Sequence, residues 1–399
     1  MTVRVLLLEN VNTTAHQIFN EGGFQIEAVA GSLKESELVE CVKGVHLLGI
    51  RSKTRITEKV LAAADSLLSL GCFCIGTNQV DLAYANGRGI PVFNAPFSNT
   101  RSVAELVLAE VVALARQLGD RSREVHEGKW RKISVGCFEV RGKTLGIVGY
   151  GHIGTQIGVL AESFGMRVIF HDIQTKLPLG NNRATSGLAE LLSEADFVTL
   201  HVPETRETKG LIGKAEIETM AKGSYLINAS RGQVVDLDAL AAAIKTGHIA
   251  GAAVDVYPEE PEANGEGFTN PLLGLPNVIL TPHIGGSTEE AQASIGREVA
   301  TSLTKFVKAG ATSGAVNFPQ IEMSQERGTH RVLNVHHNVP GVLRDINRIV
   351  SDRQANILRQ TLSTDANIGY LMMDLDKEVA VEVARDIGLL ETNIRTRSV

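Results

Sequence analysis

Three glycines between an apolar strand and a helix restrict the fold of this 399-residue chain more than any other feature. Gly149, Gly151 and Gly154 directly follow the apolar run Thr144–Val148, and a helical pattern continues to Phe164. The first glycine suits a tight turn, the second lets the backbone approach a pyrophosphate, and the third lets helix and strand pack closely. The helix N-terminus adds amide donors and the positive end of a dipole. The pattern therefore predicts a dinucleotide-binding turn.

An acidic residue downstream sharpens this prediction. The next strand, Met166–His171, ends at Asp172, close to the expected spacing of about twenty residues. Asp172 would accept hydrogen bonds from the adenosine ribose and repel a 2′-phosphate, which favours NAD over NADP. The alternative is a packing turn without a ligand, and the joint presence of strand, helix and acid disfavours it.

Short apolar runs alternate with helical patterns through the first 281 residues, as expected for two doubly wound α/β sheets. The first set reads as buried parallel strands at Val3–Leu8, Ile26–Val29, Val45–Ile50 and Leu67–Leu70. The second set predicts six strands, at Lys143–Val148, Arg167–His171, Phe197–His201, Ser224–Asn228, Gly251–Asp255 and Val278–Thr281.

Two long helices bracket the second set of strands. Each is expected to start with a capping box, Ser102–Glu105 and Ser287–Glu290. The second α/β domain is therefore expected to be inserted into the first, leaving a cleft that can close on a ligand. The predicted boundaries are 1–98 with 287–318, 99–286, a linker at 319–330 within a polar stretch from Ala309 to Arg331, and a last domain at 331–399.

The last seventy residues follow a βαββαβ order, which is the ferredoxin-like arrangement. This unit has no evident catalytic cluster, so a regulatory or interface role is expected. Its predicted elements are strands at Val332–His336, Ile357–Thr364, Gly369–Leu375 and Asn393–Arg397, with helices at Gly341–Ser351 and Glu378–Ile387.

Composition excludes several classes of function. The chain has 39 basic and 45 acidic residues, a net charge of −6, so neither nucleic acid nor an anionic membrane is an expected partner. No apolar stretch reaches the length of a membrane span, and the N-terminus is unlike a signal peptide. The four cysteines lack metal-site spacing, so reduced thiols, no metal and a cytoplasmic location are expected.

Three polar residues follow successive strands of the predicted dinucleotide-binding sheet: Arg231, Glu260 and His283. Singly, each has an ordinary explanation, such as an ion pair for Arg231 or a solvated loop histidine for His283. Together they supply what oxidation of a secondary alcohol needs besides a hydride acceptor. Arg231 can bind a carboxylate, His283 can take the hydroxyl proton, and Glu260 can hold and charge the imidazole.

Several motifs resemble those of the D-2-hydroxyacid dehydrogenases. They are Gly149-Tyr-Gly-His-Ile-Gly154, Asn228-Ala-Ser-Arg-Gly232, Asp255-Val-Tyr-Pro-Glu-Glu-Pro261 and Thr281-Pro-His-Ile-Gly-Gly-Ser-Thr288. Supporting stretches are Arg51–Arg55, Gly71–Asp81 and Val92–Glu105. The likeness runs end to end and extends to bacterial members with a C-terminal ACT domain. It implies a flavodoxin-like substrate-binding domain, an inserted Rossmann NAD-binding domain and a C-terminal ferredoxin-like ACT domain.

By this resemblance, Arg231, Glu260 and His283 form the catalytic set. The substrate side would include Arg51, Ser52, Asn99, Lys132, Arg231 and Gln292, with Lys132 near a distal phosphate. The implied NAD contacts are Gly149, Gly151, His152, Ile153, Gly154, Asp172, Ala229, Ser230, Arg231, Asp255, His283, Ile284, Gly285 and Gly286.

The resemblance also implies regulation and assembly. Paired ACT domains bind an amino acid between subunits, and His336, Asn338 and Asn356 match positions that hold serine in feedback-inhibited members. His337 and Val339 flank Asn338 where relatives often carry an acid and an arginine, so a dimerisation sheet without an effector stays open. A homo-oligomer, specifically a tetramer, is expected.

The implied activity is NAD-dependent oxidation of 3-phospho-D-glycerate to 3-phosphohydroxypyruvate, the committed step toward L-serine, with serine as feedback inhibitor. A side activity reducing 2-oxoglutarate to 2-hydroxyglutarate is compatible with it. Two alternatives are another D-2-hydroxyacid reductase, acting on hydroxypyruvate or glyoxylate, and an NAD-sensing binding protein. The ACT domain and the cationic substrate loop weigh against the first alternative, and the full catalytic set with the ACT domain weighs against the second.

Overall fold

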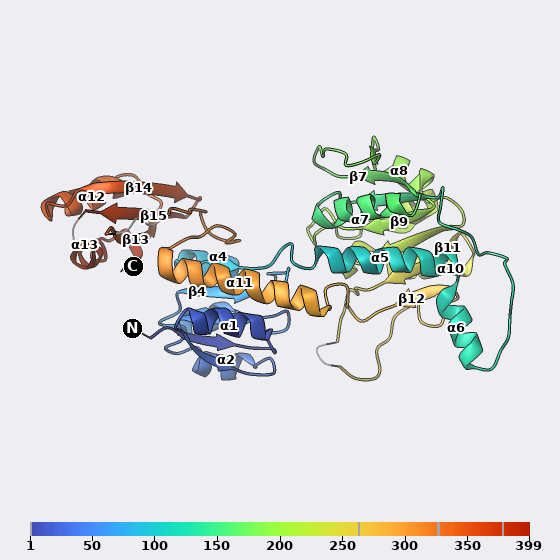
Figure 1. Cartoon of the computed structure of the whole chain (residues 1–399), viewed down its shortest axis with the longest axis horizontal. Helices are drawn as coiled ribbons and strands as arrows, with labels where there is room; N and C mark the ends of the chain where they lie inside the picture. The colour runs from blue at the N-terminus through green and yellow to red at the C-terminus, as the bar shows by residue number, and fades with distance from the viewer. Residues whose placement is uncertain (1, 262–263, 325–327, 377–378) are drawn as a thin grey trace. The chain divides into compact units, whose positions relative to one another are not determined.

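The computed structural model describes residues 2–261, 264–324, 328–376 and 379–399. The chain divides into two compact units, and the second interrupts the first in the sequence (Figure 1). The first unit comprises Met1–Ser98 and Gln292–Val399, and the second comprises Asn99–Ala291. Within the described residues, no helix is both long and apolar enough to cross a membrane.

The second unit contains a parallel seven-stranded sheet with the order β12-β11-β10-β9-β6-β7-β8. The order reverses between β6 and β9, and ligands bind beside such a point in open α/β sheets. The doubly wound sheet is confirmed, with β8 as a seventh strand beyond the six predicted. The strands are β6 (Thr144–Val148), β7 (Arg167–His171), β8 (Arg183–Ala184), β9 (Phe197–Leu200), β10 (Ser224–Asn228), β11 (Ile249–Val254) and β12 (Val278–Leu280).

Helices cover both faces of this sheet, which is why its central strands β6, β9 and β10 are buried along their whole length. Leu145 and Ile147 pack toward α5 and α7, which lie side by side in Figure 1, whereas Val198 and Leu200 pack toward α8, α9 and α10. The helices are α5 (Thr100–Ala115), α6 (Leu118–His126), α7 (His152–Ser163), α8 (Leu188–Glu194), α9 (Lys214–Thr219) and α10 (Leu237–Lys245), with a 3₁₀ turn at Gly232–Val234.

The first unit contains a parallel five-stranded sheet with the flavodoxin-like order β2-β1-β3-β4-β5. The prediction that its second strand is buried is wrong, because β2 lies at the edge and is largely exposed. Helix α11 packs over β4, where a Cβ on Gly71 would meet Val299 and Leu303. The elements are β1 (Arg4–Leu7), α1 (Thr13–Glu21), β2 (Gln25–Ala28), α2 (Glu35–Cys41), β3 (Leu47–Ile50), α3 (Glu58–Ala63), β4 (Ser69–Cys72), α4 (Leu82–Gly87), β5 (Val92–Phe93) and α11 (Glu289–Ala309).

The C-terminal residues form an antiparallel four-stranded sheet with the order β14-β15-β13-β16, and the βαββαβ prediction is confirmed. Helices α12 and α13 cover one face, and the other face joins the core around α11. The elements are β13 (His330–His337), α12 (Val342–Asp352), β14 (Ile357–Thr364), β15 (Ile368–Leu375), α13 (Ala380–Ile387) and β16 (Asn393–Ser398). Glu378, the expected first residue of the last helix, lies outside the described residues.

Both predicted capping boxes are wrong. Helix α5 already begins at Thr100, so Ser102 lies inside it, with its hydroxyl 2.7 Å from that of Thr288. Helix α11 begins at Glu289, and the Thr288 hydroxyl, not that of Ser287, accepts the Ala291 amide at 3.2 Å. In both cases another polar residue near the expected cap can also begin the helix, so the sequence leaves two possible starting positions.

The stretch from Ala309 to Arg331 is less linker-like than its composition suggests. Phe318 and Ile321 are buried in the core of the first unit, and Ala315 forms an antiparallel bridge with Phe93. The segment up to Ile321 is therefore packed, whereas residues 325–327 of the predicted linker at 319–330 lie outside the described residues.

Candidate active site

Arg231, Glu260 and His283 follow three strands that are neighbours in the sheet of the second unit. Arg231 follows β10, Glu260 follows β11 and His283 follows β12, and the sheet order is β12-β11-β10. Because these strands are parallel, their carboxyl ends meet at one edge. The topology thus brings together residues that are up to 52 positions apart in the sequence.

His283 and Glu260 form a close pair. The imidazole Nδ1 lies 2.8 Å from Oε2 and 3.0 Å from Oε1 of the carboxylate. The side chains are 52% and 37% exposed, so the pair is open to a small molecule. With Nδ1 engaged by a carboxylate, Nε2 is the nitrogen left to exchange a proton with a substrate.

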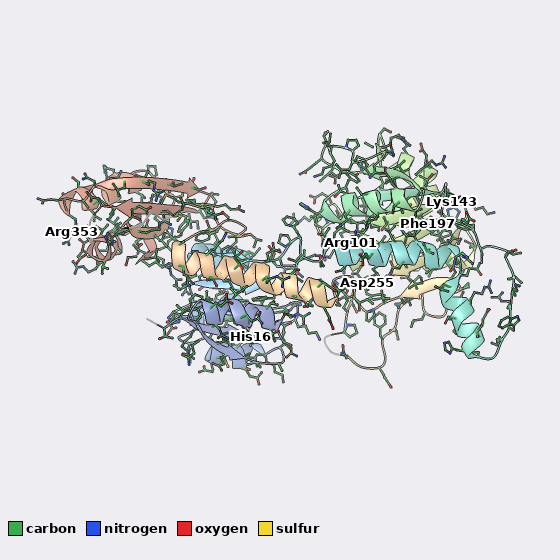
Figure 2. All side chains as sticks on the ribbon, in the orientation of Figure 1. His16, Arg101, Lys143, Phe197, Asp255 and Arg353 are labelled. Carbon is green, nitrogen blue, oxygen red and sulfur yellow. The ribbon has the colours of Figure 1, made fainter. Side chains whose placement is uncertain are left out.

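Asp255 fixes the loop that carries His283. Its carboxylate, at the end of β11 (labelled in Figure 2), accepts the Thr281 hydroxyl at 2.6 Å and the amides of Ile284 and Gly285, both at 2.8 Å. Its carbonyl accepts the His283 amide at 2.8 Å. His283 has a φ of +55°, a left-handed conformation that costs free energy in a non-glycine residue. The contacts to Asp255 hold the histidine in this strained position.

Arg231 is positioned by its own strand end. The Asn228 amide group donates to the Arg231 carbonyl at 3.0 Å, and Nη1 of Arg231 donates to the Ser230 carbonyl at 2.7 Å. A Cβ on Gly232 would lie 1.9 Å from the carbonyl carbon of Tyr257, so only glycine allows this approach of β10 to the segment after β11. That close approach packs the turn after Arg231 against Tyr257 and Pro258, which precede Glu260.

The charges of the three residues act on one another. The hydrogen bond to Glu260 raises the pKa of His283, against the effect of burial and of the positive charge on Arg231. Burial acts to raise the pKa of Glu260, but the hydrogen bond from His283, with Arg231 adding to it, leaves that pKa below its ordinary value. The carboxylate is thus ionised and stabilises the protonated imidazole.

The glycine-rich turn has the features that a pyrophosphate needs. Gly149 has a φ of +92°, and a Cβ there would lie 2.4 Å from the His201 carbonyl. A Cβ on Gly151 would project into open space, and α7 begins after it without a side-chain cap. A Cβ on Gly154 would lie 2.2 Å from the Gly149 carbonyl, which explains the third glycine. These features fit a dinucleotide phosphate at the start of α7.

The other predicted NAD residues lie around the same edge of the sheet. Asp172 follows β7, and its carboxylate accepts the amides of Tyr150 and Gln174, both at 2.9 Å. The Ser230 hydroxyl donates to Asn228 at 2.8 Å, beside Ala229. His152 and Ile153 open α7, and Ile284, Gly285 and Gly286 belong to the loop held by Asp255.

The predicted substrate residues fall into different units. Arg51 and Ser52 follow β3 and Gln292 lies in α11, all in the first unit. Asn99 and Lys132 belong to the second unit, where Lys132 is exposed. Asn99 is buried beside the loop that carries His283, since a Cβ on Gly286 would lie 2.5 Å from the side-chain nitrogen of Asn99.

The predicted effector residues lie in the C-terminal sheet and its turns. His336 is buried, with Nδ1 2.8 Å from the side-chain oxygen of Asn334, and burial lowers its pKa. Asn338 is exposed and donates to the Asp365 carbonyl at 2.7 Å, and the exposed Asn356 donates to the Asp376 carboxylate at 2.9 Å.

Sequence reasoning missed two residues of this region. Glu110 on α5 is 3% exposed, neither of its carboxyl oxygens has a hydrogen-bond partner, and burial followed by the charge of Asp255 raises its pKa to about 8. The Tyr257 hydroxyl lies 3.0 Å from the carbonyls of both Val254 and Thr281 and shares its one hydrogen between these two acceptors. Glu110 interrupts an apolar helix face, and that interruption was the available signal. Among the described residues there is no group of three or more potential metal ligands.

Two family models match the chain. Residues 108–285 match the NAD-binding domain of the D-isomer specific 2-hydroxyacid dehydrogenases, and residues 333–392 match an ACT domain like that of the AHAS small subunit. The first match covers most of the second unit, including Arg231, Glu260 and His283, and the second covers the C-terminal antiparallel sheet except for the start of β13 and for β16.

Curated relatives match nearly the whole chain. A D-3-phosphoglycerate dehydrogenase from Dictyostelium discoideum is 55% identical over 395 residues, covering 99% of this chain and 97% of that protein. One from Escherichia coli K12 is 49% identical over 398 residues, covering 99% and 97%.

Solved structures with a bound dinucleotide share the fold. A D-lactate dehydrogenase from Aquifex aeolicus, complexed with NAD and lactic acid, has a TM-score of 0.68 at 28% identity, covering 79% of this chain and 100% of that one. An NAD-dependent formate dehydrogenase from Staphylococcus aureus, in complex with NAD, has a TM-score of 0.66 at 28% identity, covering 77% and 96%.

Proposed function

The chain belongs to the D-isomer-specific 2-hydroxyacid dehydrogenase family, and from this premise we propose that Arg231, Glu260 and His283 are its catalytic set. Its activity is the NAD-dependent oxidation of 3-phospho-D-glycerate to 3-phosphohydroxypyruvate, a step of L-serine biosynthesis. The C-terminal ACT domain is consistent with feedback regulation by serine.

In the proposed mechanism, Arg231 binds the substrate carboxylate and sets C2 in place. Bound NAD supplies a hydride acceptor for the hydrogen on C2. Nε2 of His283 takes the proton from the C2 hydroxyl, so that a C=O bond forms as the C–H and O–H bonds break. Glu260 stabilises the imidazolium that results, and the same proton returns in the reverse reaction. The hydrogen bonds that Asp255 accepts from the backbone amides of Ile284 and Gly285 keep the imidazole in position throughout.

The observation that carries this proposal is the double contact of His283 Nδ1 with Glu260 beside Arg231. An NAD-sensing binding protein would need neither a polarised histidine nor a guanidinium at the mouth of the dinucleotide site. The residues implied for the substrate side, Arg51, Ser52, Asn99, Lys132 and Gln292, remain part of the proposal.

Replacing Arg231 tests the carboxylate-binding role. R231K keeps the charge but loses bidentate geometry, so kcat/KM for 3-phosphohydroxypyruvate should fall about 10- to 100-fold while NAD affinity is retained. R183K is the matched control, because Arg183 pairs with Glu190 on the surface of the same unit. An unchanged kcat/KM in R231K would remove Arg231 from the catalytic set. Parallel assays with 2-oxoglutarate, glyoxylate and hydroxypyruvate measure the side activities.

We further propose that L-serine binds between paired ACT domains at His336, Asn338 and Asn356, and inhibits by restraining closure of the units. Titration of serine against NADH oxidation should give saturable inhibition. A flat response up to millimolar serine would favour a dimerisation sheet without an effector.

Assembly, location and domain limits complete the proposal. We propose that the protein is cytoplasmic. We also propose that it is a homotetramer, and sedimentation equilibrium would test this assembly through its mass. The proposed division is a substrate domain (1–98 and 287–318), an NAD domain (99–286), a linker (319–330) and an ACT domain (331–399). Limited proteolysis tests it, and a first cut in the linker after the packed Ile321 would support it.

A further inference from the structure

Glu9 holds the loop that carries Arg51 and Ser52. Its carboxylate accepts three backbone amides of that loop, from Arg51 at 3.3 Å, Lys53 at 3.0 Å and Thr54 at 2.8 Å. Nη1 of Arg51 also donates to the Glu9 carbonyl at 3.4 Å. Glu9 follows β1 and Arg51 follows β3, which are adjacent parallel strands. The carboxylate therefore spans two neighbouring strand ends.

The backbone around Glu9 is strained to make these contacts. Glu9 and Asn10 have φ values of +62° and +52°, so two successive non-glycine residues adopt the left-handed conformation. Such residues persist where the surrounding structure fixes them, and they cluster at functional sites. The Glu9 amide donates to the Gly31 carbonyl at 3.1 Å, which fixes the backbone of Glu9 from its other side.

A second side chain fixes the opposite side of the loop. Nε2 of Gln79 donates to the Arg51 carbonyl at 2.8 Å and to the Gly76 carbonyl at 3.2 Å. The loop is thus held at its amides by Glu9 and at a carbonyl by Gln79. Both side chains of interest, Arg51 and Ser52, then project from a backbone with little freedom to move.

The placement of a carboxylate here conflicts with simple electrostatics. The substrate side of this enzyme receives an anion with a carboxylate and a phosphate, and a nearby negative charge repels it. Glu9 is 8% exposed, so its charge is also costly to bury without donors. The three amide donors offset the cost of burying the charge. The position of Glu9 is therefore better explained by the loop that its carboxylate holds than by its negative charge.

We propose that Glu9 is a positioning residue for the reaction, which presets Arg51 and Ser52 for binding of the phosphorylated substrate. The proposal rests on the substrate role proposed above for Arg51 and Ser52. Glu9 acts through the loop and does not itself touch the substrate.

The test is the KM for 3-phosphohydroxypyruvate in two Glu9 variants. E9Q replaces one acceptor oxygen by a donor group facing an amide, and E9D keeps the charge but shortens the side chain by one methylene. Both should raise KM about tenfold or more, with a smaller change in kcat and unchanged NAD affinity. If the charge alone mattered, E9Q would lower KM and E9D would leave it unchanged, and either result would overturn the proposal. D65N is the matched control, because Asp65 accepts the Gly44 amide at 2.8 Å elsewhere in the same unit.

The double variant with Arg51 separates this proposal from the one on which it rests. R51A alone should raise KM, and E9Q should add little in the R51A background, because both act through one loop. An unchanged KM in R51A would mean that the substrate role of Arg51 is wrong. The positioning role of Glu9 alone would be rejected if KM rose in R51A but not in E9Q. It would also be rejected if the effects of R51A and E9Q on KM were fully additive in the double variant. A structural role of Glu9 without positioning would lower the melting temperature and leave KM as it is.

Discussion

Two ion pairs in different regions of the molecule differ in burial, and this difference separates the pair that we propose to be reactive from a structural one. The His283–Glu260 pair joins loops at the carboxyl ends of parallel strands, with side chains 52% and 37% exposed. The Arg331–Asp374 pair lies inside the antiparallel C-terminal sheet, with both side chains 0% exposed.

The two pairs differ further in how completely they are satisfied. All five donor hydrogens of Arg331 are matched, by two contacts to Asp374 at 2.6 and 2.9 Å and by the carbonyls of Ala309, Met323 and Ser324. His283 instead uses only Nδ1 on Glu260, and Nε2 remains available to a substrate. A side chain whose hydrogen-bonding groups are all paired has a structural role, whereas an unengaged nitrogen on a titratable side chain can exchange a proton with a substrate.

Removing the reactive imidazole should have the largest effect. H283A should lower kcat by about 10²- to 10⁴-fold, because proton transfer to a positioned base contributes that much. NAD affinity, measured by fluorescence titration, should be retained. H248A is the control, since His248 is a partly buried histidine of the same unit that contacts the Ile217 carbonyl. Equal turnover in H283A and H248A would contradict the comparison.

Breaking the structural pair should cost stability and leave the pH dependence of turnover alone. D374A leaves a buried guanidinium without its carboxylate, which should lower the free energy of unfolding by about 3–5 kcal/mol. Thermal unfolding followed by circular dichroism measures this loss. D345A is the control, because Asp345 forms a surface pair with Arg344 and such pairs contribute little. A D374A variant as stable as D345A would show that the buried pair is not structural.

Glu110 combines properties of the two pairs, since it is buried like Asp374 but unpartnered. Its folded pKa, raised to about 8 by burial and by Asp255, lies above its unfolded value. The folded state therefore binds the extra proton, and the free energy of unfolding should fall as pH rises from about 4.5 to 8, by up to 1.4 kcal/mol per pH unit. E110Q, which cannot ionise, should lack this decline. Denaturant titrations of both proteins at pH 5 and pH 8.5 test this, and parallel declines would contradict it.

The sequence predicted the features that depend on local patterns. The strand at Ser224–Asn228 and the glycine turn at Gly149 were placed correctly, because continuous apolar runs and obligatory glycines leave few alternatives. The proximity of His283 and Glu260 also followed, since neighbouring parallel strands end at one edge. The edge position of β2 was missed, although Glu27 interrupts the apolar residues of the predicted strand Ile26–Val29 and is the local signal of an exposed strand.

Features that depend on tertiary contacts could not be predicted. Glu9 follows an apolar strand like any surface acid, and only the fold brings the amides of Arg51–Thr54 to its carboxylate. The helix starts at Thr100 and Glu289 differ from the capping boxes because several polar residues compete for the cap, and local sequence does not decide between them. The substrate residues belong to different units, and local sequence does not place them beside one another, so their role stays a prediction.

The central claim is that Glu260 sets the pKa of His283 for proton transfer, and the pH dependence of kcat/KM tests it most directly. In the oxidation direction His283 must be neutral to accept the proton, so the acidic limb of the profile reports its pKa. The hydrogen bond to Glu260 raises that pKa, so the wild-type limb should lie above the ordinary histidine value. E260Q should shift the limb to lower pH and reduce the plateau. An acidic limb at the same pH in both proteins would contradict the account.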